Sequence, residues 1–213
     1  DSSFNEKDLL ALGAKKTLVL PLLVDLAKWS VPANPGIASA VRARGSANFV
    51  HVGRFAPNKC IEDIIRTFYF YNHKIDKNSH LWLVGSEVDT DLYSFELRSL
   101  VKDLRLHEHV SFPGSLADSE VKAIYENAAI YLCMSEHEGF CVPLIEAMHF
   151  GIPVLAYNSS AIAETLGDGG LLLANKSHAE IAELMHLVLH SPELREKLKT
   201  QGQLRKFCKA NFL

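Results

Sequence analysis

The sequence predicts an α/β domain with a Rossmann-like, doubly wound and mostly parallel β-sheet. From Ala47 onward, short apolar runs alternate with longer amphipathic segments. Nearly every position within a run is apolar, which is typical of strands that are buried on both faces. Strands that alternate with helices favour a parallel sheet whose right-handed crossovers cover both faces. The predicted strands are 49–52, 81–84, 110–112, 129–134, 152–157 and 170–173.

Helices are predicted between and after these strands. Residues 59–73 repeat their apolar side chains at helical spacing. Ser177 with Glu180 predicts a capping box at the start of a second helix. Ser191 followed by Pro192 predicts a third helix, with a good N-cap residue and proline at the first helical position.

Residues 1–46 lack this alternation of strands and helices. The segment 30–36 is rich in proline and turn-forming residues, so we interpret it as a linker or an entry loop. We therefore expect residues 1–46 to be the end of a preceding domain or a linker, and residues 47–213 to form the sheet domain.

Composition narrows the class of protein. The chain has 213 residues, is 48% hydrophobic and carries a net charge of −3, which is typical of a globular domain and not of a nucleic-acid-binding protein. Its cysteines have neither zinc-knuckle nor redox-motif spacing, so we expect reduced thiols in a cytoplasmic protein. The longest apolar stretch, 18–24, is too short to span a bilayer. The cysteines are Cys60, Cys133, Cys141 and Cys208.

The loop after the first predicted strand carries glycine and positive charge. Gly53 lets a ligand approach the backbone, and Arg54 and Lys59 flank a segment that enters a helix. Cations and free backbone N–H groups at a helix start suit a diphosphate. The alternative is that both cations are ordinary surface charges, since the loop matches neither a dinucleotide-binding fingerprint nor a phosphate-binding P-loop.

The loop after the fourth predicted strand carries two glutamates. Pro143 is well placed in the first turn of a helix, which leaves the N–H groups of 140–144 partly free for an anion. Glu138 precedes this turn and Glu146 follows it, and carboxylates accept hydrogen bonds from vicinal sugar hydroxyls. The alternative is that Glu146 only complements the helix dipole and that Glu138 is a solvated loop charge.

These segments resemble a known family. The two glutamates of segment 138–146 are similar to the paired-glutamate signature of retaining glycosyltransferases of GT-B architecture, glycosyltransferase family 4 (group 1) in particular. The order and spacing of further motifs agree over roughly residues 47–206. These motifs are Val52-Gly53-Arg54-Phe55 with Lys59, Val110-Ser111-Phe112-Pro113-Gly114, Gly151-Ile152-Pro153-Val154, and Glu164 with Gly167-Asp168-Gly169-Gly170; Pro21 to Asp25 resembles the family's crossing from its N-terminal domain.

The resemblance implies the C-terminal, nucleotide-sugar-binding half of a GT-B enzyme. Such an enzyme transfers a hexose with retention to a glycan or lipid-linked acceptor, here with a mannosyltransferase-like role in polysaccharide synthesis. The acceptor binds to the N-terminal half of such an enzyme, so the isolated chain is expected to be inactive. No metal or cofactor is implied, nor any nucleic acid, and the enzyme is expected in the cytoplasm at the inner face of the membrane.

The resemblance also implies roles for particular residues. Arg54 and Lys59 hold the diphosphate and offset the charge of the leaving group, Glu138 orients the hydroxyls of the donor sugar, and Glu146 holds the ribose. The first three are the expected catalytic residues. The expected substrate-binding residues are Gly53, Gly114, Gly139, Phe140, Cys141, Val142 and Glu146.

The chain departs from the family at two positions, where Cys60 and Cys141 replace the usual glycines. Other functions also stay open: a glycoside hydrolase that uses the two glutamates, a non-catalytic binding domain, and a GT-B-fold epimerase. Two further groups of residues are candidates for metal binding. Asp89 with Asp91 is better explained as a loop and helix cap, and His107 with His109 shows no third ligand.

Overall fold

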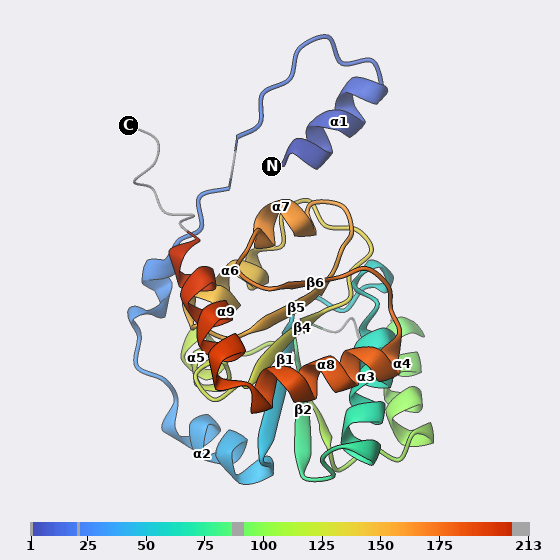
Figure 1. Ribbon diagram of the computed structural model, residues 1–213, viewed down its shortest axis with the longest axis vertical. Coiled ribbons are helices and arrows are strands. Elements are labelled where there is room, and N and C mark those ends of the chain that lie inside the picture. Colours follow the sequence, from blue (N-terminus) through green and yellow to red (C-terminus); the bar gives the residue numbers. More distant parts are fainter. Residues whose placement is uncertain (1, 21, 87–91, 206–213) are drawn as a thin grey trace.

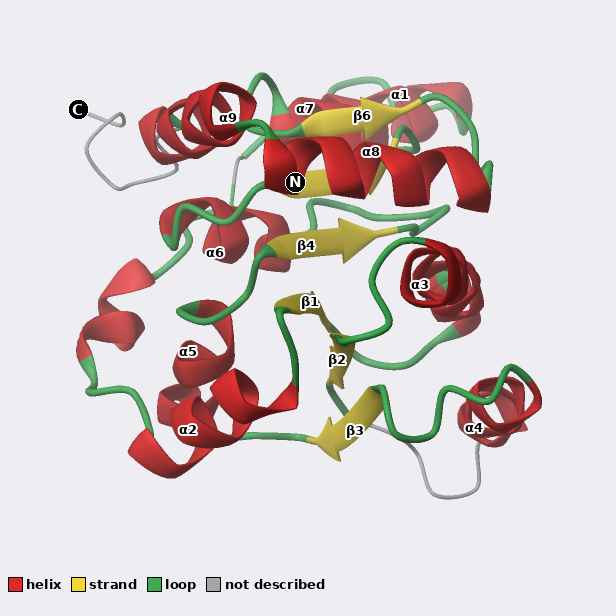
Figure 2. Ribbon diagram, turned by 60° about the horizontal axis from the view of Figure 1, so that its bottom comes forward, coloured by secondary structure: helices red, strands yellow, loops and turns green. Residues whose placement is uncertain are grey.

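The computed structural model describes residues 2–20, 22–86 and 92–205. Within them lies a six-stranded sheet in the order β3-β2-β1-β4-β5-β6, and every strand pair is parallel. Helices cover both faces of this sheet (Figures 1 and 2). The predicted Rossmann-like fold is confirmed. The strands are β1 (Ala47–Val52), β2 (Ser79–Val84), β3 (Val110–Gly114), β4 (Ile130–Cys133), β5 (Val154–Tyr157) and β6 (Leu171–Leu173).

The strand order creates a switch point between β1 and β4. Strands β2 and β3 follow β1 on one side of it. Strand β4 then pairs with the other side of β1, and β5 and β6 extend the sheet in that direction. Loops at the carboxyl ends of β1 and β4 therefore leave in opposite directions, and ligands bind at such a switch point in sheets of this kind.

Two apolar layers hold the helices on the sheet. Phe49 faces the layer that contains α3 and α8, whereas the next residue, Val50, faces the layer of α2, α5 and α6. Both side chains are fully buried, which explains why the strands are continuously apolar in sequence. The helices are α2 (Pro35–Arg44), α3 (Ile61–Lys74), α4 (Leu92–Asp103), α5 (Asp118–Tyr125), α6 (Val142–His149), α7 (Ile162–Leu166), α8 (His178–His190) and α9 (Pro192–Leu204).

The two predicted N-caps have different outcomes. The Ser191 hydroxyl accepts a hydrogen bond from the Leu194 amide at 3.3 Å, so the predicted cap of α9 is confirmed. The predicted capping box at Ser177 is wrong, because the Ser177 side chain caps no amide of α8. Its own amide donates to the side chain of Asn175 at 3.0 Å instead.

We expect Ser191→Ala to lower the free energy of unfolding by about 1 kcal/mol, because it removes a cap acceptor of α9. Ser177→Ala is the matched control and should change it by less than about 0.5 kcal/mol, as is usual for a surface substitution without a cap. Urea denaturation of both variants measures the difference. Equal losses would contradict the assignment of the caps.

The N-terminal part contains structure that the sequence did not predict. Residues 26–44 were expected in a linker, but they form the 3-10 helix η1 (Leu26–Ser30) and α2, and both pack against α5. Asn34 caps α2 by accepting hydrogen bonds from two amides, while Trp29 and Val41 are buried. Residues 26–44 therefore pack with the sheet domain. The assignment of the preceding residues to another domain stays a prediction.

A further helix, α1 (Ser3–Ala11), lies beyond an extended segment and contacts α7 (Figure 1). The Ser3 amide donates to both carboxylate oxygens of Glu164 at 2.9 and 3.1 Å. Within the residues that the structure describes, every helix is too short or too polar to cross a membrane.

Candidate functional site

Three glycines lie where β1, β2 and β3 end. The Gly53 amide donates to the Val84 carbonyl at 2.9 Å, and the Gly85 amide donates to the Gly114 carbonyl at 3.0 Å. A Cβ on Gly85 would lie 1.8 Å from the Gly53 carbonyl oxygen, so only glycine permits this approach. Gly53 and Gly114 were predicted at the site. Gly85 was missed, although it directly follows an apolar run.

Gly114 leaves room above the end of β3. It has a φ of +76°, in the left-handed region that favours glycine, and a Cβ built there would meet no atom within 4 Å. A ligand could therefore approach the backbone at this position, and the contact of Gly114 with a substrate stays a prediction.

The start of α6 presents backbone donors. Cys141 is the N-cap residue, but its side chain makes no cap hydrogen bond. Its amide and that of Val142 have no hydrogen-bond acceptor among the described residues, as is usual for the first turn of a helix. The Thr165 hydroxyl donates to the Phe140 carbonyl at 2.5 Å and fixes the loop that also contains Gly139. This segment has the donors and the positive dipole end that an anion needs.

Both family departures lie in the left-handed backbone region that favours glycine. Cys60 has a φ of 46° at the start of α3, and Cys141 has a φ of 66° at the start of α6. Side chains other than glycine adopt the left-handed region at a cost of about 1–2 kcal/mol per residue. The cysteines thus preserve the turns and leave some strain in them.

Lys59 and Glu138 form an ion pair at the switch point. The Lys59 ammonium donates to both carboxylate oxygens of Glu138, at 2.6 and 2.7 Å. The Glu138 side chain is 8% exposed and that of Lys59 is 21% exposed. They come from the loops after β1 and β4, and the sequence predicted both residues without predicting that they pair. The Ser160 hydroxyl accepts from the Glu138 amide at 2.8 Å and holds the glutamate in place.

Arg54 lies in the loop after β1 and its side chain is exposed. Within residues 2–20, 22–86 and 92–205 it forms no ion pair and no side-chain hydrogen bond. Arg54 thus lies in the same loop as Lys59 but forms no ion pair with Glu138.

Glu146 is buried in α6 and already has two partners. The Lys28 ammonium lies 2.7 Å from one carboxylate oxygen, and the Tyr125 hydroxyl donates to the other at 3.1 Å. Burial, reinforced by the negative charge of Glu146, raises the pKa of Tyr125 well above its usual value, so this hydroxyl keeps its proton. Lys28 and Tyr125 were missed, because neither belongs to a recognisable motif. No described contact joins Glu146 to Glu138.

A charged network supports the loop before Glu138. The Lys176 ammonium lies 2.9 Å from Asp63 in α3 and 3.0 Å from Glu136 in this loop. Burial alone would lower the pKa of Lys176, but its hydrogen bonds to both carboxylates raise it. His178 adds a contact of 3.0 Å to Asp63. This network ties the Glu138 loop to α3, and it was not predicted.

The two weaker metal candidates do not add to the site. His107 and His109 precede β3, so they lie at the opposite edge of the parallel sheet, and no metal-ligating group among the described residues includes them. Asp89 and Asp91 lie outside the described residues.

Fold and site together define a Rossmann-type protein whose switch point has backbone donors and positive charge suited to an anion. The N-terminus of α6, the Lys59 ammonium and the glycine turns lie there, and the buried Glu138 carboxylate contacts Lys59. This is the arrangement that a phosphate-containing ligand with a polar appendage requires.

Comparison with known proteins identifies the family. The family model described as "Glycosyl transferases group 1" matches residues 38–205. The chain belongs to this family.

Individual relatives agree. A GDP-mannose:cellobiosyl-diphosphopolyprenol alpha-mannosyltransferase of Xanthomonas oryzae pv. oryzae is 25% identical over 195 residues, which are 89% of this chain and 48% of that protein. The O-antigen chain mannosyltransferase RfbU of Salmonella typhimurium is 32% identical over 58% of this chain and 33% of its own length. This chain thus matches less than half the length of these relatives.

Solved structures show the same fold. The Anabaena protein HepE in complex with UDP and glucose superposes with a TM-score of 0.79 at 20% identity, over 95% of this chain and 56% of that one. The C-terminal domain of a glycosyl transferase group 1 family protein, LpcC from Francisella tularensis, superposes with a TM-score of 0.72 at 26% identity, over 89% of this chain and 100% of that one. These structures bear out the GT-B half predicted from the sequence.

Proposed function

We propose that the chain binds a nucleoside-diphosphate sugar and supplies the donor site of a retaining hexosyltransferase of glycosyltransferase family 4. The observation that carries this proposal is the Lys59–Glu138 pair beside the uncapped start of α6. A cation and free amides suit the diphosphate, and an adjacent buried carboxylate suits the hydroxyls of the attached sugar.

Each site residue receives a role under this proposal. Arg54, Lys59 and the amides of residues 140–142 hold the diphosphate and stabilise the negative charge that develops on it as the sugar leaves. Glu138 accepts hydrogen bonds from hydroxyls of the donor sugar, and Glu146 accepts them from the ribose. The glycines at the ends of β1 and β3, Gly53 and Gly114, let the ligand approach the backbone.

The relatives support a hexose donor. Two of them are named as mannosyltransferases, and one of these names includes GDP-mannose. The Anabaena structure contains UDP and glucose. We propose a mannosyltransferase-like activity in polysaccharide synthesis on the cytoplasmic side of a membrane. The acceptor, a glycan or a lipid-linked sugar, binds to the part of such enzymes that this chain does not match.

Isothermal titration with a panel of nucleotide sugars tests the proposal. We expect one nucleoside-diphosphate hexose to bind, and the free hexose to bind much more weakly, because the diphosphate provides the charged contacts. Binding of glycans without any binding of nucleotides would favour the glycoside hydrolase instead. A hydrolase holds no diphosphate, so the cations and free amides would have no role in it.

We expect donor binding to survive a chelator. Arg54, Lys59 and the start of α6 already supply positive charge at the site, so the diphosphate needs no divalent cation. The measurement is the dissociation constant of the nucleotide sugar with and without EDTA, which should differ by less than about twofold, a free-energy difference well under 1 kcal/mol. Loss of binding in EDTA that manganese restores would show that the site needs a metal and would favour Asp89 and Asp91 as its ligands.

A further inference from the structure

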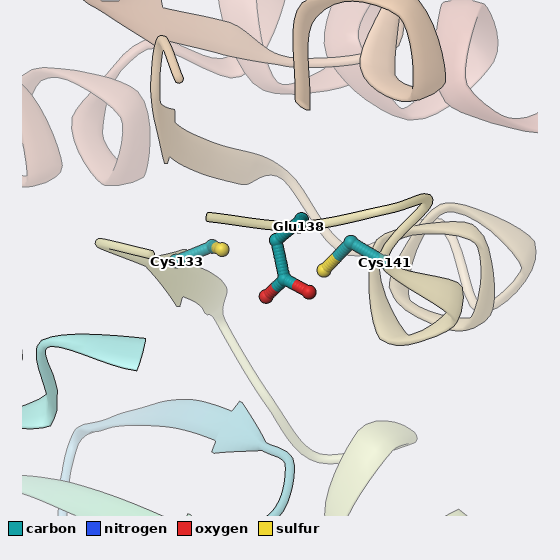
Figure 3. Close-up of side chains that lie close together, drawn as sticks. All are labelled: Cys133, Glu138 and Cys141. Carbon is teal, nitrogen blue, oxygen red and sulfur yellow. The ribbon is translucent and has the colours of Figure 1, made fainter. Parts of the chain in front are cut away.

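Two buried thiols lie against Glu138, and the proposed function uses neither of them. Cys133 ends β4 and is fully buried, while Cys141 precedes α6 and is 9% exposed. Their sulfur atoms and a carboxylate oxygen of Glu138 all lie within 4.8 Å of one another. Figure 3 shows the two sulfurs on either side of the carboxylate. Three potential metal ligands thus converge from two separate segments.

The chemistry of this set matches a thiophilic cation. Zinc bonds to thiolates at about 2.3 Å and to carboxylates at about 2.0–2.2 Å, so these three side chains need only a small inward shift to share one ion. We propose that Cys133, Glu138 and Cys141 bind a thiophilic divalent cation such as Zn²⁺. Both thiols release their protons to solvent on binding, and water completes the coordination.

Lys59 competes with the cation for Glu138. Its ammonium lies 2.6 Å from the carboxylate, and a divalent cation cannot occupy the cluster while this contact persists. The Lys59 side chain is 21% exposed, so it can turn into solvent when the metal enters. Metal binding therefore separates Lys59 from Glu138. If the proposed donor site is correct, zinc and the nucleotide sugar compete.

A second group of potential ligands, Cys60 with Glu62 and Asp63, is less suited to such a cation. It has a single thiol. Asp63 already contacts Lys176 at 2.9 Å, and Glu62 accepts a hydrogen bond from a tyrosine hydroxyl. Soft metals prefer sets with more thiolates, so they should select the Cys133 cluster.

Titration of the reduced chain with Cd²⁺, in the absence of nucleotide, tests the site through thiolate-to-metal charge-transfer absorption. We expect one equivalent to bind, and Zn²⁺ to displace it. Cys133→Ala and Cys141→Ser should each weaken binding more than about tenfold, since even outer-shell partners contribute 10–100-fold. Cys60→Ser is the matched control and should leave the affinity unchanged. Lys59→Met should strengthen it roughly tenfold, because one unit of charge repulsion is removed.

Absence of the absorption band, or a band that survives both Cys133→Ala and Cys141→Ser in folded protein, would overturn the proposal. If Cys133→Ala does not fold, Glu138→Gln removes the third ligand and is judged by the same titration. A second titration adds the nucleotide sugar. A metal affinity that the nucleotide sugar does not change would contradict the proposed donor site while supporting the metal site. Failure of the donor site can therefore be distinguished from failure of the metal site.

Discussion

Arg54→Ala should weaken the binding of a nucleoside diphosphate by about tenfold or more and leave the melting temperature unchanged. A charge-assisted hydrogen bond contributes about 1.5–3 kcal/mol, and tenfold in affinity corresponds to about 1.4 kcal/mol. Arg54 is exposed and makes no ion pair with the described residues, so its removal leaves no partner unsatisfied. Isothermal titration and thermal denaturation measure the two quantities.

Lys59→Ala should weaken the same binding by a similar factor but also lower the stability. It leaves the buried Glu138 carboxylate without its cation, which costs about 1–3 kcal/mol. In the double variant Lys59→Ala/Glu138→Gln the melting temperature should recover while the affinity stays low. Lys102→Ala, at an exposed position of α4, controls for the loss of one positive charge. Wild-type affinity in both Arg54→Ala and Lys59→Ala would refute the diphosphate assignment.

The second large effect separates the roles of the two glutamates. Glu146→Gln should weaken both the nucleoside diphosphate and the nucleotide sugar, because both contain the ribose. Glu138→Gln should weaken only the nucleotide sugar. The bare diphosphate should bind to it at least as tightly as to the wild type, because the neutral amide no longer competes for Lys59. Each selective loss should be about tenfold, from a carboxylate hydrogen bond of about 1.5–3 kcal/mol.

Lys28→Met is the matched control for Glu146. Lys28 and Tyr125 bind Glu146 in the free protein, so Glu146→Gln also lowers stability by loosening η1 and α5 from α6. If Glu146 acted only through these contacts, Lys28→Met would reproduce the loss of stability and both ligands would bind normally to Glu146→Gln. Four dissociation constants and two melting temperatures decide between the roles.

Local sequence patterns were sufficient for most of the fold. The strands begin and end within about two residues of the predicted positions, because buried parallel strands are largely apolar and their ends are marked by glycine or polar residues. Helix α2 was missed, because Pro35 and Gly36 at its start suggested a turn. Proline is equally favourable in the first turn of a helix, and only packing against α5 distinguishes the two cases.

The site was predicted as a set of residues but not as a set of contacts. Each loop could be placed at the carboxyl edge of the sheet, since this follows from strand order. The contacts between Lys59 and Glu138 and between Lys28 and Glu146 join segments that are remote in sequence. Opposite charges that lie far apart in a chain carry no local pattern, so such pairs appear only when the loops are folded against each other. The cluster of Cys133, Glu138 and Cys141 was missed for a related reason, because its spacing fits no zinc motif.

The pairing of β1 with β4 has a consequence for how the chain folds. His51 at the end of β1 donates from Nδ1 to the Leu132 carbonyl at 2.9 Å, across 81 positions of sequence. Contacts of such long range are reached slowly, since the intervening chain must lose entropy before they form. The strands on either side of the β1–β4 pairing are joined by contacts of shorter range in sequence, so they can acquire order earlier. A ligand that contacts the loops after both β1 and β4 binds the native state and not the unfolded chain, so it stabilises this long-range pairing.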